Sequence, residues 1–253
     1  MRKKVVPYFQ NSKKHIYSNH EGLFDGESGL LNYNESIVTT FHTFMAADTN
    51  GADSLKNESI IDFGAGAGHL ADIFLSKFSI KPICVELDPT LLELLLSKKY
   101  LAVNNLKDID QAAAVIYSSN VLEHIEDDSK ALNDIASNLQ KGGKLLVYVP
   151  ALMFLFSDLD FKAGHFRRYG KKELIQKITD AGFRVEKCFY NDSLGVPASL
   201  ALKMLGYRNK LNLGTGKSLV FYDTKVYPVS QLLDRIGMKY VMGKNLYLFA
   251  IKK

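Results

Sequence analysis

From Ser59 to Val149 the chain alternates short apolar runs with amphipathic segments, and this alternation restricts the fold more than any other feature. The apolar runs are continuous, which is typical of strands buried on both faces of a parallel sheet. We therefore expect an α/β protein with a doubly wound, mostly parallel sheet. The pattern predicts strands over 59–63, 82–87, 100–103, 114–119 and 144–149, with helices over 69–78, 89–100 and 127–140.

The rest of the chain adds helices and two further strands to this core. Apolar residues at helical spacing predict a helix over 30–47, and a helix over 171–182 precedes a strand over 183–190. The final strand, 245–251, is expected to run antiparallel and close a seven-stranded sheet. Residues 104–111 leave room for one helical turn at most, and the Gly142–Gly143 pair predicts the stop of the preceding helix.

Composition favours one globular domain. Of 253 residues, 47% are apolar and 23% charged, and no linker or repeat interrupts the chain. We expect a single domain over 1–253. Its expected parts are a helical N-terminal lid (1–55), a cofactor-binding core (58–190), a helical insertion (191–243) and the last strand (244–253).

Several function classes receive little support. The longest apolar run, 145–156, has twelve residues and contains Pro150, whereas a membrane-spanning helix needs about 20. The N-terminus lacks the apolar stretch of a secretory signal. The net charge of +5 comes from scattered lysines, so nucleic-acid binding is not expected. Cys84 and Cys188 lie in predicted strands and are typical of buried thiols in a reducing compartment, so we expect a cytoplasmic protein.

A glycine loop lies between the first predicted strand and helix. Asp62 is followed by Gly64, Gly66 and Gly68, so backbone N–H groups can approach a ligand where side chains would collide. A tight turn without a ligand remains an alternative. Dinucleotide sites need the spacing G-x-G-x-x-G, but the sixth position here is His69. The carboxylate of Asp62 also disfavours a pyrophosphate, so the loop suits a cationic ligand.

Glu86 ends the second predicted strand. A carboxylate at this position can accept hydrogen bonds from both hydroxyls of a ribose. A nucleoside that carries an amino acid and a sulfonium would therefore match both the glycine loop and Glu86.

Five stretches together resemble the class I S-adenosylmethionine-dependent methyltransferases of the small-molecule type. They are IIDFGAGAG, VELDP, YSSNVLEHIEDD, LQKGGKLLVYVP and GHFRRYGKKELIQKITDAGF, in the order of that family. The resemblance implies the seven-stranded sheet with a reversed last strand and S-adenosylmethionine as cofactor. It also implies cofactor contacts from Asp62, Gly64, Ala65, Gly66, Glu86, Leu87, Asn105, Leu106, Ser119 and Asn120. Asp108 is a further candidate at the adenine, and Asp88 either joins the site or only caps the helix at Pro89.

The turn after the fourth strand contains the first candidates for catalysis. Asn120 should face the methyl-bearing end of the cofactor, with Glu123 and His124 one helical turn further on. His124 could equally be a packing histidine. Similar quinone-pathway O-methyltransferases carry an acid and then Glu-His, and can hold a divalent cation. Asn120 replaces that acid here, so we expect no metal.

The stretch GHFRRYG provides the second set. His165 is a candidate base, Arg167 and Arg168 can bind a carboxylate or phosphate of the acceptor, and Tyr169 can wall the pocket. Because the arginines are adjacent, we expect one to pair with Asp158 or Asp160 and the other to face the substrate.

The expected function is methyl transfer to a small-molecule or lipid-linked acceptor, with oxygen as the expected target. Methyl transfer is an in-line displacement that depends mainly on positioning, with a general base where the nucleophile carries a proton. Aromatic residues Tyr8, Phe9, Tyr17, Phe24 and Tyr33 suggest a lid over the pocket. The alternatives are a nicotinamide-dependent oxidoreductase and a binding module without turnover.

Overall fold

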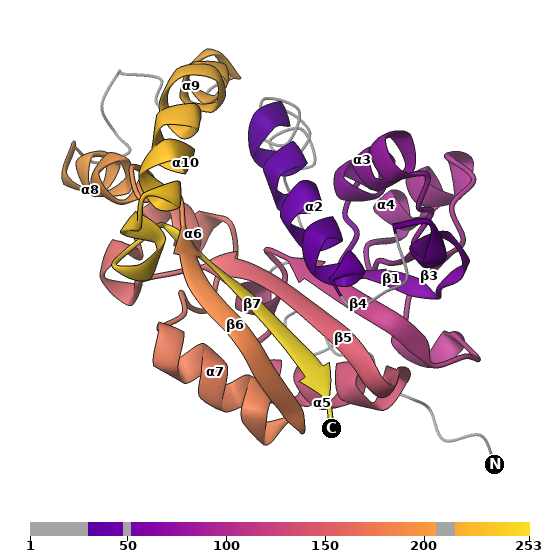
Figure 1. The fold of residues 1–253 in the computed structure, drawn as a ribbon. Helices are drawn as coiled ribbons and strands as arrows, with labels where there is room; N and C mark the ends of the chain where they lie inside the picture. Colours follow the sequence, from indigo (N-terminus) through magenta and orange to yellow (C-terminus); the bar gives the residue numbers. More distant parts are fainter. Residues whose placement is uncertain (1–29, 48–51, 206–215) are drawn as a thin grey trace.

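The computed structural model describes residues 30–47, 52–205 and 216–253, and within them the chain forms one seven-stranded sheet (Figure 1). The strand order is β3-β2-β1-β4-β5-β7-β6. The first five strands pair in parallel, whereas β7 runs antiparallel between β5 and β6. The predicted sheet with a reversed last strand is therefore confirmed. The strands are β1 (Ile60–Phe63), β2 (Ile83–Val85), β3 (Ala102–Val103), β4 (Ala113–Ser119), β5 (Leu139–Pro150), β6 (Phe183–Asn191) and β7 (Asn245–Lys252).

Helices connect the strands and follow the predicted alternation. The α-helices are α2 (Leu31–Ala46), α3 (His69–Phe78), α4 (Pro89–Ser97), α5 (Asp128–Asn138), α6 (Asp158–Lys162), α7 (Lys171–Asp180), α8 (Gly195–Leu205), α9 (Gly216–Phe221) and α10 (Tyr227–Arg235). Shorter helical turns are η1 (Ala52–Asn57), η2 (Leu106–Asp108), η3 (Leu122–His124), η4 (Met153–Leu155), η5 (Tyr222–Val226) and η6 (Met238–Tyr240). Within the described ranges, none of the helices has the length and apolar character needed to cross a membrane.

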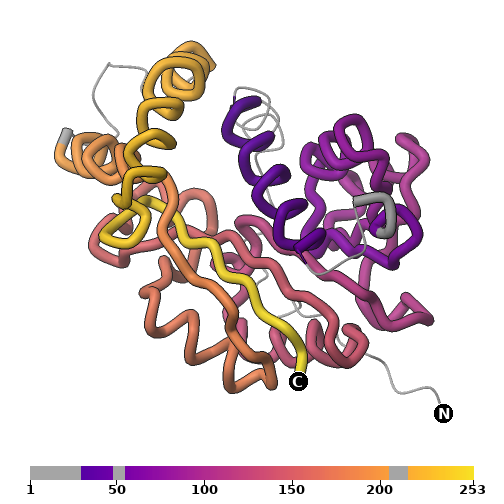
Figure 2. Tube along the Cα trace, viewed as in Figure 1, coloured from indigo at the N-terminus to yellow at the C-terminus, as the bar shows by residue number. Residues whose placement is uncertain are grey.

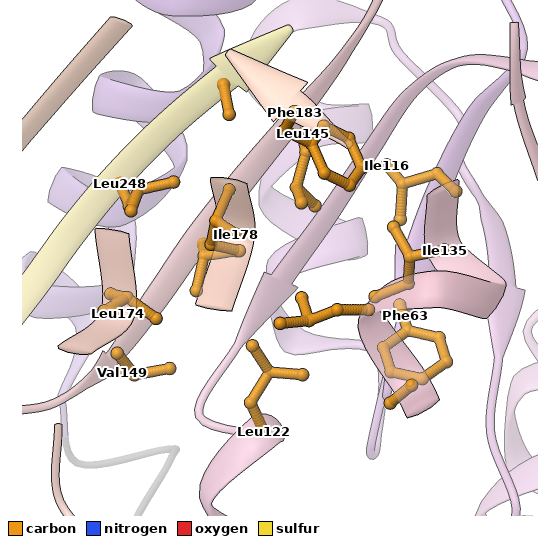
Figure 3. Packing of buried hydrophobic residues seen from close by; sticks show 14 of the residues in the cluster. Phe63, Ile116, Leu122, Ile135, Leu145, Val149, Leu174, Ile178, Phe183 and Leu248 are labelled. Atoms are coloured by element: carbon orange, nitrogen blue, oxygen red, sulfur yellow. The ribbon is translucent and has the colours of Figure 1, made fainter. Parts of the chain in front are cut away.

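Two apolar layers sandwich the sheet because successive strand residues point to opposite faces. On one face Ile116 and Leu145 pack with residues of α5 and α7, as Figure 3 shows for Ile135, Leu174 and Ile178. On the other face, neighbouring strand residues pack against α2 and α3. The strand ends, which carry the predicted site, are thereby held on a rigid scaffold.

Helix α2 forms part of the second layer. Ile37, Phe41 and Met45 are almost fully buried, and the helix contacts α3, β5 and η5. Figure 2 shows its trace between α3 and the C-terminal helices. The first 29 residues, including Tyr8, Phe9, Tyr17 and Phe24, lie outside the described residues, so the lid stays a prediction.

Two predicted boundaries are wrong. The helix predicted over 127–140 ends at Asn138, and β5 begins at Leu139 and continues through the predicted glycine turn. Leu139 is buried and pairs with Ala113, and the register then shifts so that Val115 pairs with Lys144. Gly142, with φ 77°, lies in this irregularity, so the glycines form a bulge within the strand. The third strand is also shorter than predicted, because only Ala102 and Val103 pair with β2; Tyr100 precedes it and donates its hydroxyl to Asp72 at 2.8 Å.

Candidate active site

The glycine loop follows β1 and turns onto the end of β2. The backbone N–H groups of Gly64 and Ala65 donate to the Val85 carbonyl oxygen at 2.9 and 3.1 Å. Gly64 has φ 80°, and a Cβ there would lie 2.4 Å from Cγ2 of Val121. Gly66 has φ 56°, and a Cβ there would meet nothing within 4 Å. The loop backbone therefore packs against the protein at Gly64 and faces open space at Gly66.

Glu86 clamps this loop from the end of β2. Its Oε2 accepts a hydrogen bond from the Gly66 N–H at 2.8 Å, and its Oε1 accepts one from the Asp88 N–H at 2.9 Å. Burial raises the pKa of Glu86, while these backbone hydrogen bonds oppose the rise. Asp88 caps α4, because its Oδ1 accepts from the N–H groups of Thr90 and Leu91.

The other predicted cofactor residues of this half lie around the same strand ends. Asp62 is buried within β1, in register with Cys84. Leu106 is buried at the start of η2, and Asn105 caps that turn by accepting from the Lys107 N–H at 3.0 Å. Asp108 is exposed, and Leu87 is half-buried beside Glu86.

The turn after β4 adjoins the glycine loop through the contact between Val121 and Gly64. Asn120 has φ 53°, and its N–H donates to the Tyr148 carbonyl oxygen at 2.8 Å. Its side-chain amide is exposed, 3.5 Å from Oγ of Ser119. The predicted residues after β1 and β4 thus come together at the carboxyl ends of these two neighbouring strands.

Glu123, His124 and His165 gather just beyond this turn. Each offers one ligand-type atom, and these three atoms lie within 4.8 Å of one another. Burial raises the pKa of Glu123 to about 8, despite the nearby Arg168 guanidinium. Burial, with the neighbouring His165, lowers the pKa of His124 to about 3, so its imidazole is neutral at pH 7.

His165 is oriented by a carboxylate. Its Nδ1 lies 2.9 Å from Oδ1 of Asp160, which is buried at the start of α6. Burial alone would raise the pKa of Asp160, but hydrogen bonds from His165 and Arg168 lower it to about 2. A carboxylate that holds one imidazole nitrogen fixes the direction of the other.

The arginines depart from the expectation that one would pair and the other face the substrate, because both pair with carboxylates. Arg168 Nε lies 2.7 Å from Oδ1 of Asp160, and Arg167 Nη1 lies 2.8 Å from Oδ2 of Asp128. Tyr169 is buried, and its hydroxyl donates to Oδ2 of Asp128 at 2.8 Å. All three side chains therefore hold the loop in place.

Asp128 is the site residue that sequence reasoning missed. It is 2% exposed and also accepts a hydrogen bond from Nζ of Lys177 at 2.8 Å. The signal was present, because two acids follow Glu126 directly and two arginines occur in the loop after α6. Their pairing depends on α5 lying beside α7, which a linear pattern does not give.

A family of methyltransferase domains matches residues 36–187 of the chain. The chain belongs to this family. As a methyltransferase domain it uses S-adenosylmethionine, which confirms the predicted enzyme class and cofactor. The nicotinamide-dependent oxidoreductase does not agree with this membership. No curated protein matches the chain.

Solved structures share the fold of this methyltransferase domain. The phosphoethanolamine N-methyltransferase 2 of Haemonchus contortus, solved with S-adenosyl-L-methionine, is 16% identical with a TM-score of 0.61, covering 100% of this chain and 61% of that one. The magnesium protoporphyrin IX methyltransferase of Synechocystis PCC 6803 is 12% identical with a TM-score of 0.53, covering 88% and 84%. The cyclase SpnF is 14% identical with a TM-score of 0.51, covering 84% and 80%. Identities this low show the fold alone.

The residues of this methyltransferase domain suit its cofactor. The open space at Gly66 admits a ligand against the backbone, and the Glu86 carboxylate stands at the end of the adjacent strand. S-adenosylmethionine supplies a methyl group on a positively charged sulfur, which leaves as a neutral thioether. The chain has to hold that sulfonium and align an acceptor with it.

Proposed function

We propose that this methyltransferase transfers the methyl group of S-adenosylmethionine to a hydroxyl oxygen of a small-molecule or lipid-linked acceptor. The acceptor O–H loses its proton, the oxygen forms a bond to the methyl carbon, and the carbon–sulfur bond breaks to leave S-adenosylhomocysteine. The observation that carries the proposal is the group of Glu123, His124 and His165 next to the turn that contacts the glycine loop.

This group favours oxygen over nitrogen as the target atom. A hydroxyl becomes a good nucleophile only as its proton leaves, and assistance with that proton is worth roughly 10²–10⁴-fold. A neutral amine attacks with its lone pair and needs no such help. His165, held through Nδ1 by Asp160, is the kind of imidazole that assists a hydroxyl.

The surface beside the loop after β5 supports a lipid-linked acceptor. Met153, Phe154 and Phe161 are more than half exposed on η4 and α6, and so is Met204 on the adjacent α8. Exposed apolar side chains that lie together commonly mark interaction sites for apolar ligands. An acceptor with an acyl or polyprenyl chain would lay that chain along these residues and present its hydroxyl at His165.

The cofactor contacts form the second part of the proposal. We assign the methionine portion to Asp62, Gly64, Ala65 and Gly66 and the ribose to Glu86. Leu87, Asn105 and Leu106 are assigned to the nucleoside, with Ser119 and Asn120 at the methyl-bearing end.

The ribose assignment is tested by Glu86→Gln. Both Glu86 oxygens accept backbone N–H groups, so an amide NH₂ in one position faces a donor and the loop loses a hydrogen bond. Calorimetry with S-adenosylhomocysteine should show at least about tenfold weaker binding, the equivalent of about 1.4 kcal/mol. The control Glu93→Gln, on the exposed side of α4, should bind normally. Equal affinities of the two variants would contradict the assignment.

The oxygen target is tested with a panel of hydroxyl- and amine-bearing acceptors, free and lipid-linked, and mass spectrometry of the products. We expect a methyl ether. His165→Gln should reduce turnover by about 10²–10⁴-fold while S-adenosylhomocysteine still binds. The control His42→Gln changes a histidine that stacks on Phe78 in the α2–α3 layer. A methylated amine, or full turnover by His165→Gln, would refute the proposal. Cofactor binding without any product would favour the binding module.

A further inference from the structure

Glu123, His124 and His165 combine the ligand types of a transition-metal site. Two imidazoles and one carboxylate come from two segments, η3 and the loop after α6, which are tied together by a hydrogen bond from the Phe166 N–H to the Glu123 carbonyl oxygen at 2.8 Å. Zinc enzymes and non-haem iron enzymes both use two histidines and a carboxylate with a remaining open position.

The spacing of the three ligand atoms suits one small ion. They lie within 4.8 Å of one another. Ligands at about 2.0–2.1 Å from a tetrahedral zinc are separated by roughly 3.4 Å. The separation in the structure, within 4.8 Å, is therefore close to that of ligands around one ion.

The surroundings of the two imidazoles match those of ligand histidines. Metal-bound histidines usually hold one ring nitrogen on a carboxylate or backbone carbonyl while the other faces the ion. His165 has this partner in Asp160, at 2.9 Å from Nδ1, and Asp160 is fixed in turn by Arg168. His124 makes a hydrogen bond with the backbone of Gly164.

Glu123 supplies an independent observation. Its side chain is 0% exposed, and neither carboxylate oxygen has a hydrogen-bond partner among the described residues. A buried carboxylate without partners is costly, whereas a cation would satisfy both oxygens. The nearby Arg168 donates through Nε to Oδ1 of Asp160 at 2.7 Å and makes no hydrogen bond with Glu123.

We propose that Glu123, His124 and His165 bind one divalent transition-metal ion, with zinc as the reference ion. The expectation of no metal came from Asn120, which stands where related sequences carry an acid. Here His165, from a distant segment, supplies the third ligand. The ion's role rests on the proposed function: with His165 as one of its ligands, the ion would take over the task proposed for that imidazole, because it would draw electron density from an acceptor hydroxyl and ease loss of its proton.

The test uses the full-length protein purified without chelator. Its metal content is measured by elemental analysis, and the metal-free protein is titrated with zinc by calorimetry and with cobalt(II) by visible absorption. We expect one equivalent of zinc and a cobalt d–d spectrum that saturates at one equivalent. Glu123→Gln, His124→Gln and His165→Gln should each weaken zinc binding by more than about tenfold, because even outer-shell changes cost 10–100-fold.

His42→Gln is the matched control and should keep wild-type zinc affinity, with circular dichroism checking the fold of every variant. Wild-type zinc affinity in the three folded ligand variants would overturn the proposal. If a variant does not fold, the cobalt titration of the wild-type protein decides, and no spectrum at stoichiometric cobalt would overturn it. Zinc binding without methylation of any acceptor would refute the proposed function and leave the metal site standing.

Discussion

At the β1–β2 end of the sheet, the candidate site is built from residues that lie within about one strand–helix–strand unit of each other in the sequence. Backbone N–H groups of the glycine loop and one carboxylate, Glu86, make the contacts, and Glu86 lies 20 residues from its partner Gly66. At the β5–β7–β6 end, contacts join residues far apart. Tyr148 Oη lies 2.6 Å from Tyr33 Oη, and Tyr33 donates to Asn245, 212 residues away.

This difference between local and long-range contacts suggests which end of the sheet members of the family have in common and which end can vary from one member to another. A glycine loop held by local backbone contacts could serve any methyltransferase that binds the same cofactor, and under the proposed cofactor contacts it tolerates little change because the backbone itself would bind the ligand. A network of long-range side-chain contacts can change one pair at a time and still support the sheet. Under the proposed function the β5–β7–β6 end, which we call the acceptor end, is therefore where substrate preference could diverge without loss of the fold.

Within the glycine loop, replacement of one glycine should mainly lower stability, and replacement of the other should mainly lower cofactor affinity. Gly64→Ala should give the largest loss of stability, about 1–2 kcal/mol from the left-handed conformation and about 1–3 kcal/mol from the clash with Val121. The added methyl group of Gly66→Ala meets open space, so this variant should lose only the conformational part of the stability, but the methyl group would occupy the proposed cofactor site. Thermal unfolding and calorimetry with S-adenosylhomocysteine measure the two effects.

We expect the melting temperature to fall more for Gly64→Ala than for Gly66→Ala, while Gly66→Ala should bind S-adenosylhomocysteine at least about tenfold more weakly than wild type. Wild-type affinity of Gly66→Ala for S-adenosylhomocysteine would contradict the proposal that the cofactor lies against the backbone at Gly66.

The same contrast explains how far the sequence predicted the molecule. The alternation of strands and helices at the cofactor end and the single turn at η2 follow from local patterns, and so does the helix cap that was one of two alternatives for Asp88, because strand ends, caps and glycine loops depend on residues a few positions apart. The bulge at Gly142 differs from the predicted helix stop, since a glycine pair is typical both of a turn after a helix and of a bulge within a strand.

The candidate site was predicted as a set of residues but not as an arrangement. The pairing of Arg167 with Asp128, and the meeting of His124 with His165, require that α5, α7 and the loop after β5 lie together. Such contacts are set by packing of the whole sheet. A residue's type shows that it needs a partner, and only the fold shows which one it has.

The acceptor end should respond to loss of one hydroxyl in stability rather than in cofactor affinity. Tyr148 is fully buried, and its hydroxyl lies 2.8 Å from Oδ1 of Asn191 as well as beside Tyr33. Tyr148→Phe leaves buried polar groups unsatisfied, which costs about 1–3 kcal/mol. Chemical denaturation measures this loss. S-adenosylhomocysteine should bind within about twofold of wild type, a difference below 0.5 kcal/mol.

Tyr240→Phe, at a tyrosine that is 68% exposed, is the control and should change neither quantity. A loss of cofactor affinity in Tyr148→Phe equal to that in Gly66→Ala would mean that the two ends of the sheet are not separable.

The smallest expected effect is the loss of stability when the ion pairs that hold the loop after α6 are removed, and this loss depends on pH. Burial alone would raise the pKa of Asp128, but hydrogen bonds from Lys177, Arg167 and Tyr169 lower it below its ordinary value. A lowered pKa means that the folded state favours the carboxylate. Its stabilisation is therefore complete above the unfolded pKa of about 3.9 and is lost as the pH falls through the folded value.

Asp128→Asn should accordingly be less stable than wild type at pH 7, and the gap should close below about pH 4. The difference should stay near 1 kcal/mol, because the side chains of Arg167 and Lys177 are 21% and 26% exposed and solvent screens them. Melting temperatures of both proteins between pH 7 and pH 3 measure the gap, with the exposed Asp110→Asn as control. A gap of the same size at pH 7 and pH 3 would show that the hydrogen bonds of Asp128, and not its charge, hold the loop.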